Sequence, residues 1–209
     1  MDDQRQEINL GFTREHLPES GHMCLIYDNE AQRRKIVSEY LAAGLKQGDL
    51  IRYFTDMATP EEVCAWLSEM GVELPESRQG GSFSIIKAEK HYCPSGHFVP
   101  QEVLDGMVSR YAMAKEAGYS GSRATSEMTW ALKDIPGVDR FLEYEALINM
   151  IPHTFPFTGM CQYDARRFDG ATLFQVLQVH PYMVAQGQVV RNPYYTRPEE
   201  FLAKFRSNA

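Results

Sequence analysis

Hydrophobic residues along the chain follow two alternating patterns. Short apolar runs bounded by glycine, proline or acidic residues predict buried strands. Segments with apolar residues three and four positions apart, such as Ile36, Val37, Tyr40 and Leu41, predict helices. The predicted strands occupy residues 22–27, 49–55, 82–86, 122–125, 158–163 and 188–190. The predicted helices occupy residues 36–45, 59–70, 99–117, 138–150, 170–179 and 198–202, and residues 87–97 are expected to be irregular.

The regular alternation of strands and helices indicates the fold class. A helix between successive strands is typical of the right-handed crossovers of a parallel sheet. The sequence therefore predicts a single α/β domain in which helices flank a mainly parallel central sheet. We place this domain at residues 21–205. Residues 1–20 are polar and include Pro18, so we expect them to form an arm or linker.

Composition narrows the class of protein. A chain of 209 residues, 44% of them hydrophobic, is long enough for one domain with a full core. Its formal charge of −7 disfavours direct contact with nucleic acid, and no apolar run approaches the roughly 18–20 residues that cross a bilayer. The four cysteines lie far apart without a CxxC pair, so we expect free thiols in a reducing cytoplasm.

The loop after the first predicted strand lacks the residues that bind phosphate. Ligands of parallel sheets usually lie at the carboxyl ends of the strands. A phosphate-binding loop needs glycines that expose backbone N–H groups, a lysine, and a hydroxyl that binds Mg²⁺. Residues 27–32 instead read Tyr-Asp-Asn-Glu-Ala-Gln, with two carboxylates and no glycine. We therefore do not expect ATP hydrolysis by the usual route.

Several motifs carry a resemblance to a known family. Residues 39–53 resemble the segment that follows the phosphate-loop helix in RecA/KaiC-like ATPases. From about residue 20 to 197, the chain resembles the MEDS family of sensory domains, named for methanogens, methylotrophs and the regulator DcmR. The matching motifs are H-x-C-x-I-Y at 22–27, G-L-x-x-G-D at 44–49, S-R-A-T-S-E-M-T-W at 122–130, E-Y-E at 143–145, C-Q-Y-D at 161–164, H-P at 180–181 and N-P-Y-Y at 192–195.

The resemblance implies a three-layer RecA/KaiC-like fold without ATPase function. It also implies a role in sensing small hydrocarbon derivatives, usually within a protein that carries a DNA-binding, kinase or other output module. No helix-turn-helix pattern precedes residue 20, and the sequence ends at Ala209. We therefore expect that the output comes through a partner or that the sequence is a fragment of a longer protein.

Candidate ligand-binding residues lie within or next to these motifs. Arg123, Glu127 and Trp130 are expected at the carboxyl end of one strand, where they could bind a small polar or cationic molecule. In the alternative, Arg123 and Glu127 form a structural ion pair and Trp130 is part of the core. The full candidate set is Tyr27, Arg123, Glu127, Trp130, Tyr163, His180 and Tyr194.

The remaining acidic, histidine and cysteine residues are expected to have structural roles. We expect Glu143 and Glu145 to be solvated acids beside a buried Tyr144, with Asn149 one helical turn beyond Glu145. No close ligand pair such as CxxC supports a metal site, and nothing in the local sequence favours the thiolate that a Cys–His nucleophilic pair needs. We therefore expect no metal and no cofactor. The metal alternative uses His22, Cys24, Cys161 and His180, and the nucleophilic one pairs Cys161 or Cys93 with His180, His91 or His97.

The sequence thus predicts a non-catalytic, cytoplasmic sensory domain. It would bind a small organic ligand, such as a hydrocarbon or one-carbon derivative, and signal to a kinase, an anti-sigma factor or a DNA-binding module. We do not expect direct contact with nucleic acid or membrane. The sequence leaves open whether the chain forms a homodimer. One alternative is a degenerate nucleotide-binding protein or hydrolase that uses Glu127 as its carboxylate. Another is a pure protein-interaction module.

Overall fold

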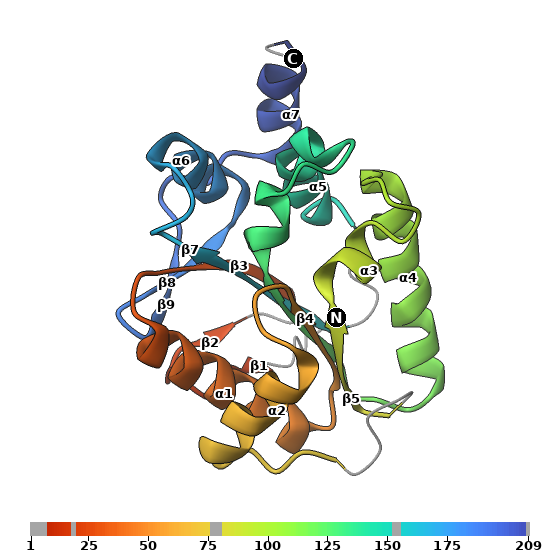
Figure 1. The fold of residues 1–209 in the computed structure, drawn as a ribbon, viewed down its shortest axis with the longest axis vertical. Coiled ribbons are helices and arrows are strands. Elements are labelled where there is room, and N and C mark those ends of the chain that lie inside the picture. Colours follow the sequence, from red (N-terminus) through yellow and green to blue (C-terminus); the bar gives the residue numbers. More distant parts are fainter. Residues whose placement is uncertain (1–7, 18–19, 76–80, 152–155, 208–209) are drawn as a thin grey trace, which may run out of the picture.

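A computed structural model of the chain describes residues 8–17, 20–75, 81–151 and 156–207. Strands and helices alternate along most of the chain, as the hydrophobic pattern predicts (Figure 1). The strands are β1 (Ile8–Asn9), β2 (His16–Leu17), β3 (Ser20–Tyr27), β4 (Leu50–Thr55), β5 (Phe83–Lys87), β6 (Ser122–Glu127), β7 (Phe157–Asp164), β8 (Tyr182–Ala185) and β9 (Gln188–Arg191). The helices are α1 (Glu30–Gln47), α2 (Pro60–Glu69), α3 (Ala88–Tyr92), α4 (Pro100–Glu116), α5 (Phe141–Ile148), α6 (Gly170–Val179) and α7 (Pro198–Ser207), with short 3₁₀ turns at Met128–Leu132 and Val138–Arg140.

The central sheet has seven strands in the order β5-β4-β6-β7-β3-β8-β9. All neighbouring strands are parallel except β8 and β9, which form an antiparallel pair at one edge. Helices α1 and α2 cover one face, and α3 to α6 cover the other (Figure 1). Helix α7 packs against α5 and α6. The structure therefore confirms the predicted α/β fold with a mainly parallel sheet between two layers of helices.

Side chains alternate between the two faces along each strand, which fixes where the polar residues point. On β3 and β7, His22, Cys24, Cys161 and Tyr163 face the layer of α3 to α6, and Cys24 is the register partner of Cys161. Arg123, Thr125 and Glu127 on β6 lie on the opposite face, under α1 and α2. Two separate sets of polar groups therefore form, one on each side of the sheet.

Three local features differ from the sequence prediction. Helix α3 lies inside the segment expected to be irregular, and strand β8 follows His180-Pro181 where no strand was expected. The expected arm is also packed onto the domain in its described part. Leu10 and Leu17 are buried against α1, so residues 8–17 extend the core on that side of the sheet. Residues 1–7 and 18–19 of the expected arm, including Pro18, lie outside the described residues.

Candidate functional site

Arg123 lies near the amino end of β6, far from the carboxyl end where we expected it. Its side chain is fully buried, and Nε donates to Asp49 Oδ2 at 2.9 Å. The other guanidinium nitrogens donate to the backbone oxygen of Tyr40 and to Gln47 Oε1, each at 2.7 Å. The expectation that Arg123 shares a cleft with Glu127 is wrong, and so is the alternative of an ion pair between them. Arg123 instead joins α1 to the central sheet.

Glu127 ends β6 at the opposite edge of the sheet, and its carboxylate is buried among donors. Oε1 accepts from the hydroxyl of Tyr53 at 2.8 Å, and Oε2 accepts from the backbone N–H groups of Asp56 and Met57, both at 2.8 Å. Arg33 lies 3.4 Å away. These contacts fix the loop after β4.

A polar cleft lies next to Glu127 at the carboxyl ends of the strands. It has a volume of about 480 Å³ and is lined by Tyr27, Arg33, Trp66, Glu127 and Asp164 among others. Among the described residues that line it are five carboxylates and three guanidinium groups. Arg33 lines the cleft and donates to Gln162 Oε1 at 2.7 Å. The cleft occupies the expected place of a polyphosphate, but its lining is acidic on balance.

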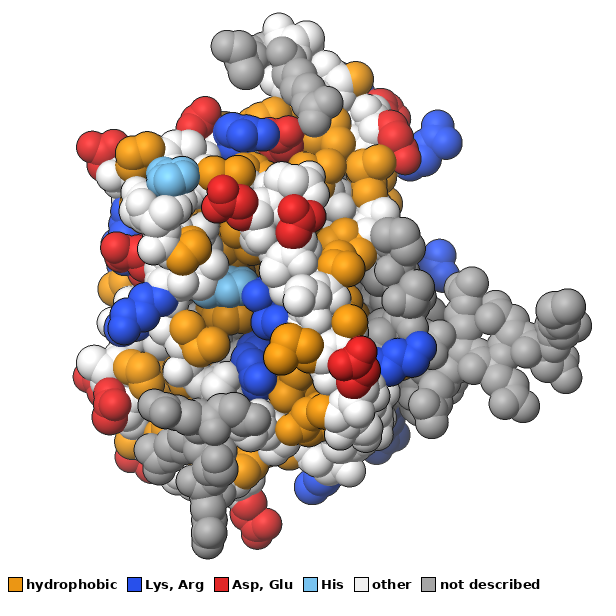
Figure 2. Space-filling model, turned by 90° about the vertical axis from the view of Figure 1, so that its right-hand side faces the viewer, with side chains coloured by type: hydrophobic (Ala, Val, Ile, Leu, Met, Phe, Trp, Pro, Cys, Tyr) orange, Lys and Arg blue, Asp and Glu red, His pale blue; other side chains and the backbone are white. Residues whose placement is uncertain are grey.

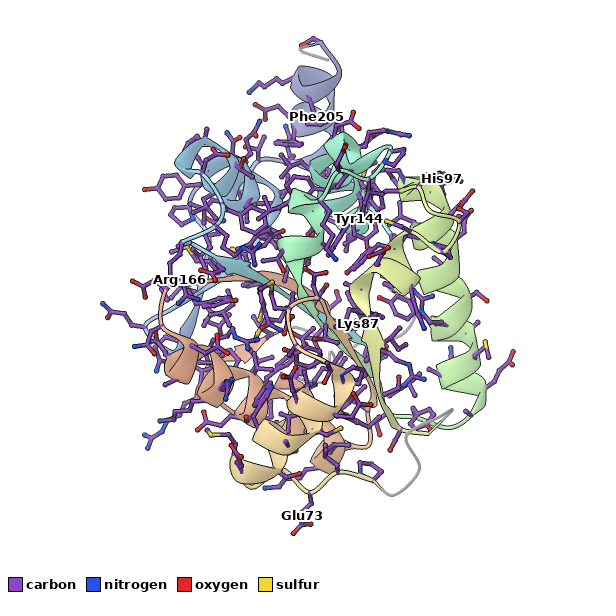
Figure 3. All side chains as sticks on the ribbon, viewed as in Figure 1. Glu73, Lys87, His97, Tyr144, Arg166 and Phe205 are labelled. Atoms are coloured by element: carbon purple, nitrogen blue, oxygen red, sulfur yellow. The ribbon has the colours of Figure 1, made fainter. Side chains whose placement is uncertain are left out.

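A smaller cavity lies on the other face of the sheet, beneath α3, α4 and α5. Aromatic side chains form much of its wall, including Tyr92, Tyr111 and Tyr144, and its volume is about 50 Å³. On the sheet side, the cavity is lined by the small residues Ala124, Ser126 and Gly159, which leave this space open. His22 and Cys161 also line the cavity. In Figure 3, Tyr144 lies in the interior between sheet and helices, whereas Arg166 lies at the periphery. This cavity is largely apolar.

The outer surface over this cavity is mixed in character. Figure 2 views the side of the molecule that carries α4 and β5, where basic side chains gather among hydrophobic ones. Arg52 and Arg110 both line the cavity, and burial lowers the pKa of each guanidinium. The hydroxyl of Tyr111 is buried without a hydrogen-bond partner among the described residues. The cavity thus combines an aromatic wall with a few polar groups, as small-molecule sites usually do.

Four buried polar side chains meet beside this cavity. They are His22 on β3, Cys161 on β7, Glu145 on α5 and His180 just after α6, and one ligand atom from each lies within 4.8 Å of all the others. Glu145 Oε2 is 3.0 Å from His22 Nε2 and 3.1 Å from His180 Nε2. Cys161 Sγ is 3.4 Å from His22 Nε2 and 3.5 Å from Glu145 Oε2. We call this set the histidine–cysteine cluster.

The electrostatics of the cluster favour an ionised Glu145. Burial alone would raise the pKa of this carboxyl, but the adjoining His180 and His22 hold it at about 2. Burial lowers the pKa of His22, and the nearby His180 lowers it further. Burial and the charge of Glu145 raise the pKa of Cys161 well above its usual value, so its sulfur is a thiol at neutral pH. These groups therefore do not support a Cys–His nucleophile.

Comparison with known proteins identifies the family. The sequence model of the MEDS family, the methanogen/methylotroph, DcmR sensory domain, matches residues 21–181. The chain belongs to the MEDS family. The transcriptional repressor DcmR of Methylorubrum extorquens (strain DSM 6343 / CIP 106787 / DM4) is 27% identical over 162 residues, which cover 76% of this chain and 57% of the repressor. The chain thus matches little more than half the length of this relative.

Solved structures of low sequence identity share the fold. An uncharacterized protein from Pyrococcus horikoshii, in complex with an unknown peptide, has a TM-score of 0.61 at 14% identity, over 81% of this chain and 80% of that one. A KaiC-like protein from Pyrococcus horikoshii OT3 has a TM-score of 0.59 at 12% identity, over 85% of this chain and 80% of that one. The MEDS domain therefore has the expected RecA/KaiC-like fold. Among the residues described, no helix is both long and apolar enough to span a membrane.

The motifs that carry the MEDS resemblance build two structural features. Gly44, Asp49 and Arg123 come from two of these motifs and form the contact between α1 and the amino end of the sheet. Four other motifs each contribute one member of the histidine–cysteine cluster: H-x-C-x-I-Y, E-Y-E, C-Q-Y-D and H-P. The cluster therefore gathers motif residues that are separated by up to 158 positions, as His22 and His180 are.

Glu145 is the member of the cluster that sequence reasoning missed. We expected Glu143 and Glu145 to be solvated, but both are buried, Glu145 completely. Glu143 pairs with Arg140 at 2.7 Å, whereas Glu145 faces the two histidines. Tyr144 is buried as expected. The signal in the sequence is the apolar context, because the helix reads Phe-Leu-Glu-Tyr-Glu-Ala-Leu-Ile and has no polar face.

The other residues that the sequence predicted to bind the ligand are scattered over the MEDS domain. Tyr27 lines the polar cleft together with Glu127. Trp130 is fully buried and stacks on Tyr92, with ring centroids 4.3 Å apart, which agrees with its alternative interpretation as a core residue. Tyr163 is also fully buried and packs edge-on against His180. Tyr194 is exposed beside Phe174 on α6. The seven candidates therefore do not form one site.

Proposed function

We propose that this MEDS domain is a non-catalytic sensory domain of a cytoplasmic regulator. It binds a small organic molecule, of the size of a hydrocarbon or one-carbon derivative, in the cavity beneath α3, α4 and α5. Binding changes the domain's affinity for a regulatory partner of the kinase, anti-sigma or DNA-binding class. The family match and the similarity to a transcriptional repressor support the regulatory role.

The apolar cavity is the observation that carries the proposal. A water molecule needs about 10–15 Å³ of such space, so a cavity of about 50 Å³ suits an organic molecule of a few heavy atoms. Its wall of tyrosine and phenylalanine rings favours an apolar or weakly polar guest. His22 and Cys161 at its side add polar contacts that can orient such a guest.

A signal requires that the ligand prefer one conformation of the domain over another. The cavity is formed by the sheet together with α3, α4 and α5, so a guest that fills it contacts several elements at once. Helix α5 also packs against α6 and α7. A ligand that shifts α5 therefore changes the surface that α6 and α7 present to a partner.

A thermal-shift panel with a pair of matched variants tests this proposal. The panel contains halomethanes, methylamines, methylated thiols and Mg²⁺–ATP. Ala124→Val adds two methyl groups to the sheet side of the cavity, and Ala65→Val adds the same groups to the polar cleft. We expect a small organic molecule to raise the Tm of the wild type and of Ala65→Val but not of Ala124→Val. A panel in which no organic molecule raises the wild-type Tm contradicts the proposal.

The polar cleft supports the rival function of nucleotide binding. Its volume of about 480 Å³ and its position at the carboxyl ends of the strands suit a nucleotide, although its acidic lining opposes one. This rival predicts that Mg²⁺–ATP raises the Tm of the wild type and of Ala124→Val, but not of Ala65→Val. It also predicts ATP turnover that is lost in Glu127→Gln. We expect neither result.

A further inference from the structure

Hydrogen bonds fix the proton positions of the two histidines in the histidine–cysteine cluster. His180 Nδ1 lies 2.8 Å from the backbone oxygen of Val176. A carbonyl oxygen only accepts hydrogen bonds, so Nδ1 of His180 carries a proton that it donates. The neutral form of this imidazole therefore presents a bare lone pair at Nε2.

Asn149 fixes His22 in the same way. The amide nitrogen of Asn149 faces the backbone oxygens of Val179, Glu145 and Ala146 at 2.8, 3.1 and 3.4 Å, which identifies it as the donor end. Its oxygen is then the group that faces His22 Nδ1 at 3.2 Å. His22 Nδ1 must donate to it, and the neutral ring again presents a bare lone pair at Nε2.

Both lone pairs point at Glu145, an acceptor. Nε2 of His22 and Nε2 of His180 lie 3.0 and 3.1 Å from the same carboxylate oxygen, Oε2. Nε2 of His180 is completely buried and has no hydrogen-bond partner of suitable geometry among the described residues. Two bare imidazole lone pairs and a carboxylate repel one another unless a cation lies between them: either a proton on Nε2, which makes the ring a donor to Glu145, or a metal ion that both rings and the carboxylate bind.

The cluster has the donor types and the spacing of a transition-metal site. Zn²⁺ binds thiolate sulfur, imidazole nitrogen and carboxylate oxygen in tetrahedral geometry, which places ligand atoms about 3.3–3.7 Å apart. Cys161 Sγ lies 3.4 Å from His22 Nε2 and 3.5 Å from Glu145 Oε2, while the two Glu145–histidine distances are a few tenths of an ångström shorter. Histidine ligands of metals usually donate their second N–H to a carbonyl or carboxylate, as both rings do here.

We propose that His22, Glu145, Cys161 and His180 together bind one divalent first-row transition-metal ion, of which Zn²⁺ best matches the donor set. Binding releases the proton of the Cys161 thiol, since the thiolate is the metal ligand. This site goes beyond the proposed sensory function, because it requires no organic ligand. Since His22 and Cys161 also line the apolar cavity, the ion lies at the cavity wall.

Co²⁺ is the probe that tests this site in the purified, chelator-treated chain of 209 residues. Tetrahedral Co²⁺ absorbs strongly in the visible, and a thiolate ligand adds charge-transfer absorption in the near ultraviolet. We expect both signals to saturate at one Co²⁺ per chain and to be displaced by Zn²⁺. Absence of the thiolate band, or no stoichiometric uptake by the folded wild type, overturns the proposal.

Matched variants assign the ligands. Cys24 and Cys161 are register partners on adjacent strands and are both buried, but only Cys161 belongs to the cluster. We expect Cys161→Ala to abolish the thiolate band and to lower Co²⁺ affinity at least about 100-fold, while Cys24→Ala keeps both. His180→Gln is paired in the same way with His91→Gln, because His91 lines the cavity outside the cluster.

Folding is checked separately for each variant. Far-ultraviolet circular dichroism of the metal-free proteins shows whether a variant keeps the fold, and only folded variants are compared. The Co²⁺ absorption spectrum of the wild type tests the site without any variant, so the proposal stays testable if one of the variants unfolds. Equal Co²⁺ affinity and an unchanged thiolate band in folded Cys161→Ala overturn the assignment. A Co²⁺ signal without any response to organic molecules supports the metal site and contradicts only the sensory proposal.

Discussion

Arg123 and Asp49 form a buried ion pair at the amino end of the sheet, with Nε and Oδ2 2.9 Å apart. Arg123 is the more deeply buried partner, and it also donates to the backbone oxygen of Tyr40. Removing one member of a buried pair leaves the other charge without compensation, which typically costs about 3–5 kcal/mol. We expect Arg123→Met to lower the free energy of unfolding by about this amount, as measured by urea denaturation.

A double-mutant cycle separates the ion pair from the rest of this contact. Burial raises the pKa of Asp49, and the Arg123 guanidinium opposes that rise. Removing Arg123 therefore leaves the buried carboxylate of Asp49 without a compensating charge. Asp49→Asn in the Arg123→Met background is then expected to restore part of the lost stability. A loss below about 1 kcal/mol in Arg123→Met contradicts the structural role of this residue.

Gly44 leaves the space through which Arg123 passes. A Cβ atom at Gly44 would lie 2.6 Å from Arg123 Nε, closer than atoms in contact can approach. Arg123 is held by several hydrogen bonds and cannot move aside freely. A glycine-to-alanine change inside a helix normally stabilises by up to about 1 kcal/mol. We expect the opposite sign for Gly44→Ala, a lower midpoint of urea denaturation.

Gly106 in α4 provides the matched control for that substitution. Its added Cβ would lie 3.1 Å from the terminal nitrogen of Arg110, which is the far end of a flexible side chain. Gly106→Ala is therefore expected to be neutral or to stabilise by up to about 1 kcal/mol. If both variants shift the denaturation midpoint in the same direction, the close approach to Arg123 is not what decides the effect.

His91 makes stability depend on pH. Its ring stacks on Phe54 with centroids 3.8 Å apart, and burial, together with the charge of Arg110, lowers its pKa to about 3. Between the unfolded pKa of about 6.5 and this value, the unfolded chain binds one proton more than the folded one. Stability is therefore full above about pH 7 and falls as the pH is lowered. We expect this histidine to account for at most about 2 kcal/mol between pH 7 and pH 5.

Urea denaturation of His91→Phe at several pH values checks this expectation. Phenylalanine keeps the stack on Phe54 but does not titrate, so the loss of stability between pH 7 and pH 5 is expected to become smaller. It does not vanish, because burial also lowers the pKa of His22. His97→Phe, at an exposed position, is the control for the substitution itself. Identical slopes for His91→Phe and the wild type argue against a depressed pKa.

The fold could be predicted because its signals are local. The capping of α2 is one example of such a local signal: the side chain of Thr59 accepts from the backbone N–H of Glu62, and the side chain of Glu62 accepts from that of Thr59. Strand β8 and helix α3 have only four and five residues, so neither is long enough to show a period. Their formation depends on the neighbouring strand β3 and on packing against β4 and β5.

The candidate site was harder to predict, since it depends on distant contacts. Arg123 was misplaced because the predicted strand ended at residue 125, two residues early, so its position in the strand was misjudged. Glu145 was assigned to solvent because charged residues on a helix usually face water. The apolar context of α5 indicates burial, but only the packing of α5 on the sheet turns this carboxylate toward His22.

Asn149 is expected to set the metal affinity of the histidine–cysteine cluster without touching the ion. Its oxygen orients His22 through Nδ1, and its loss leaves that N–H without the acceptor. Changes to such supporting groups usually lower metal affinity about 10–100-fold. We expect this loss for Co²⁺ in Asn149→Ala, with the thiolate band still present at saturation. Asn29→Ala, which removes the cap of α1 on the opposite face, is the control: it should cost about 1 kcal/mol of stability and leave Co²⁺ affinity unchanged. Equal affinities in both variants would show that Asn149 does not position a ligand.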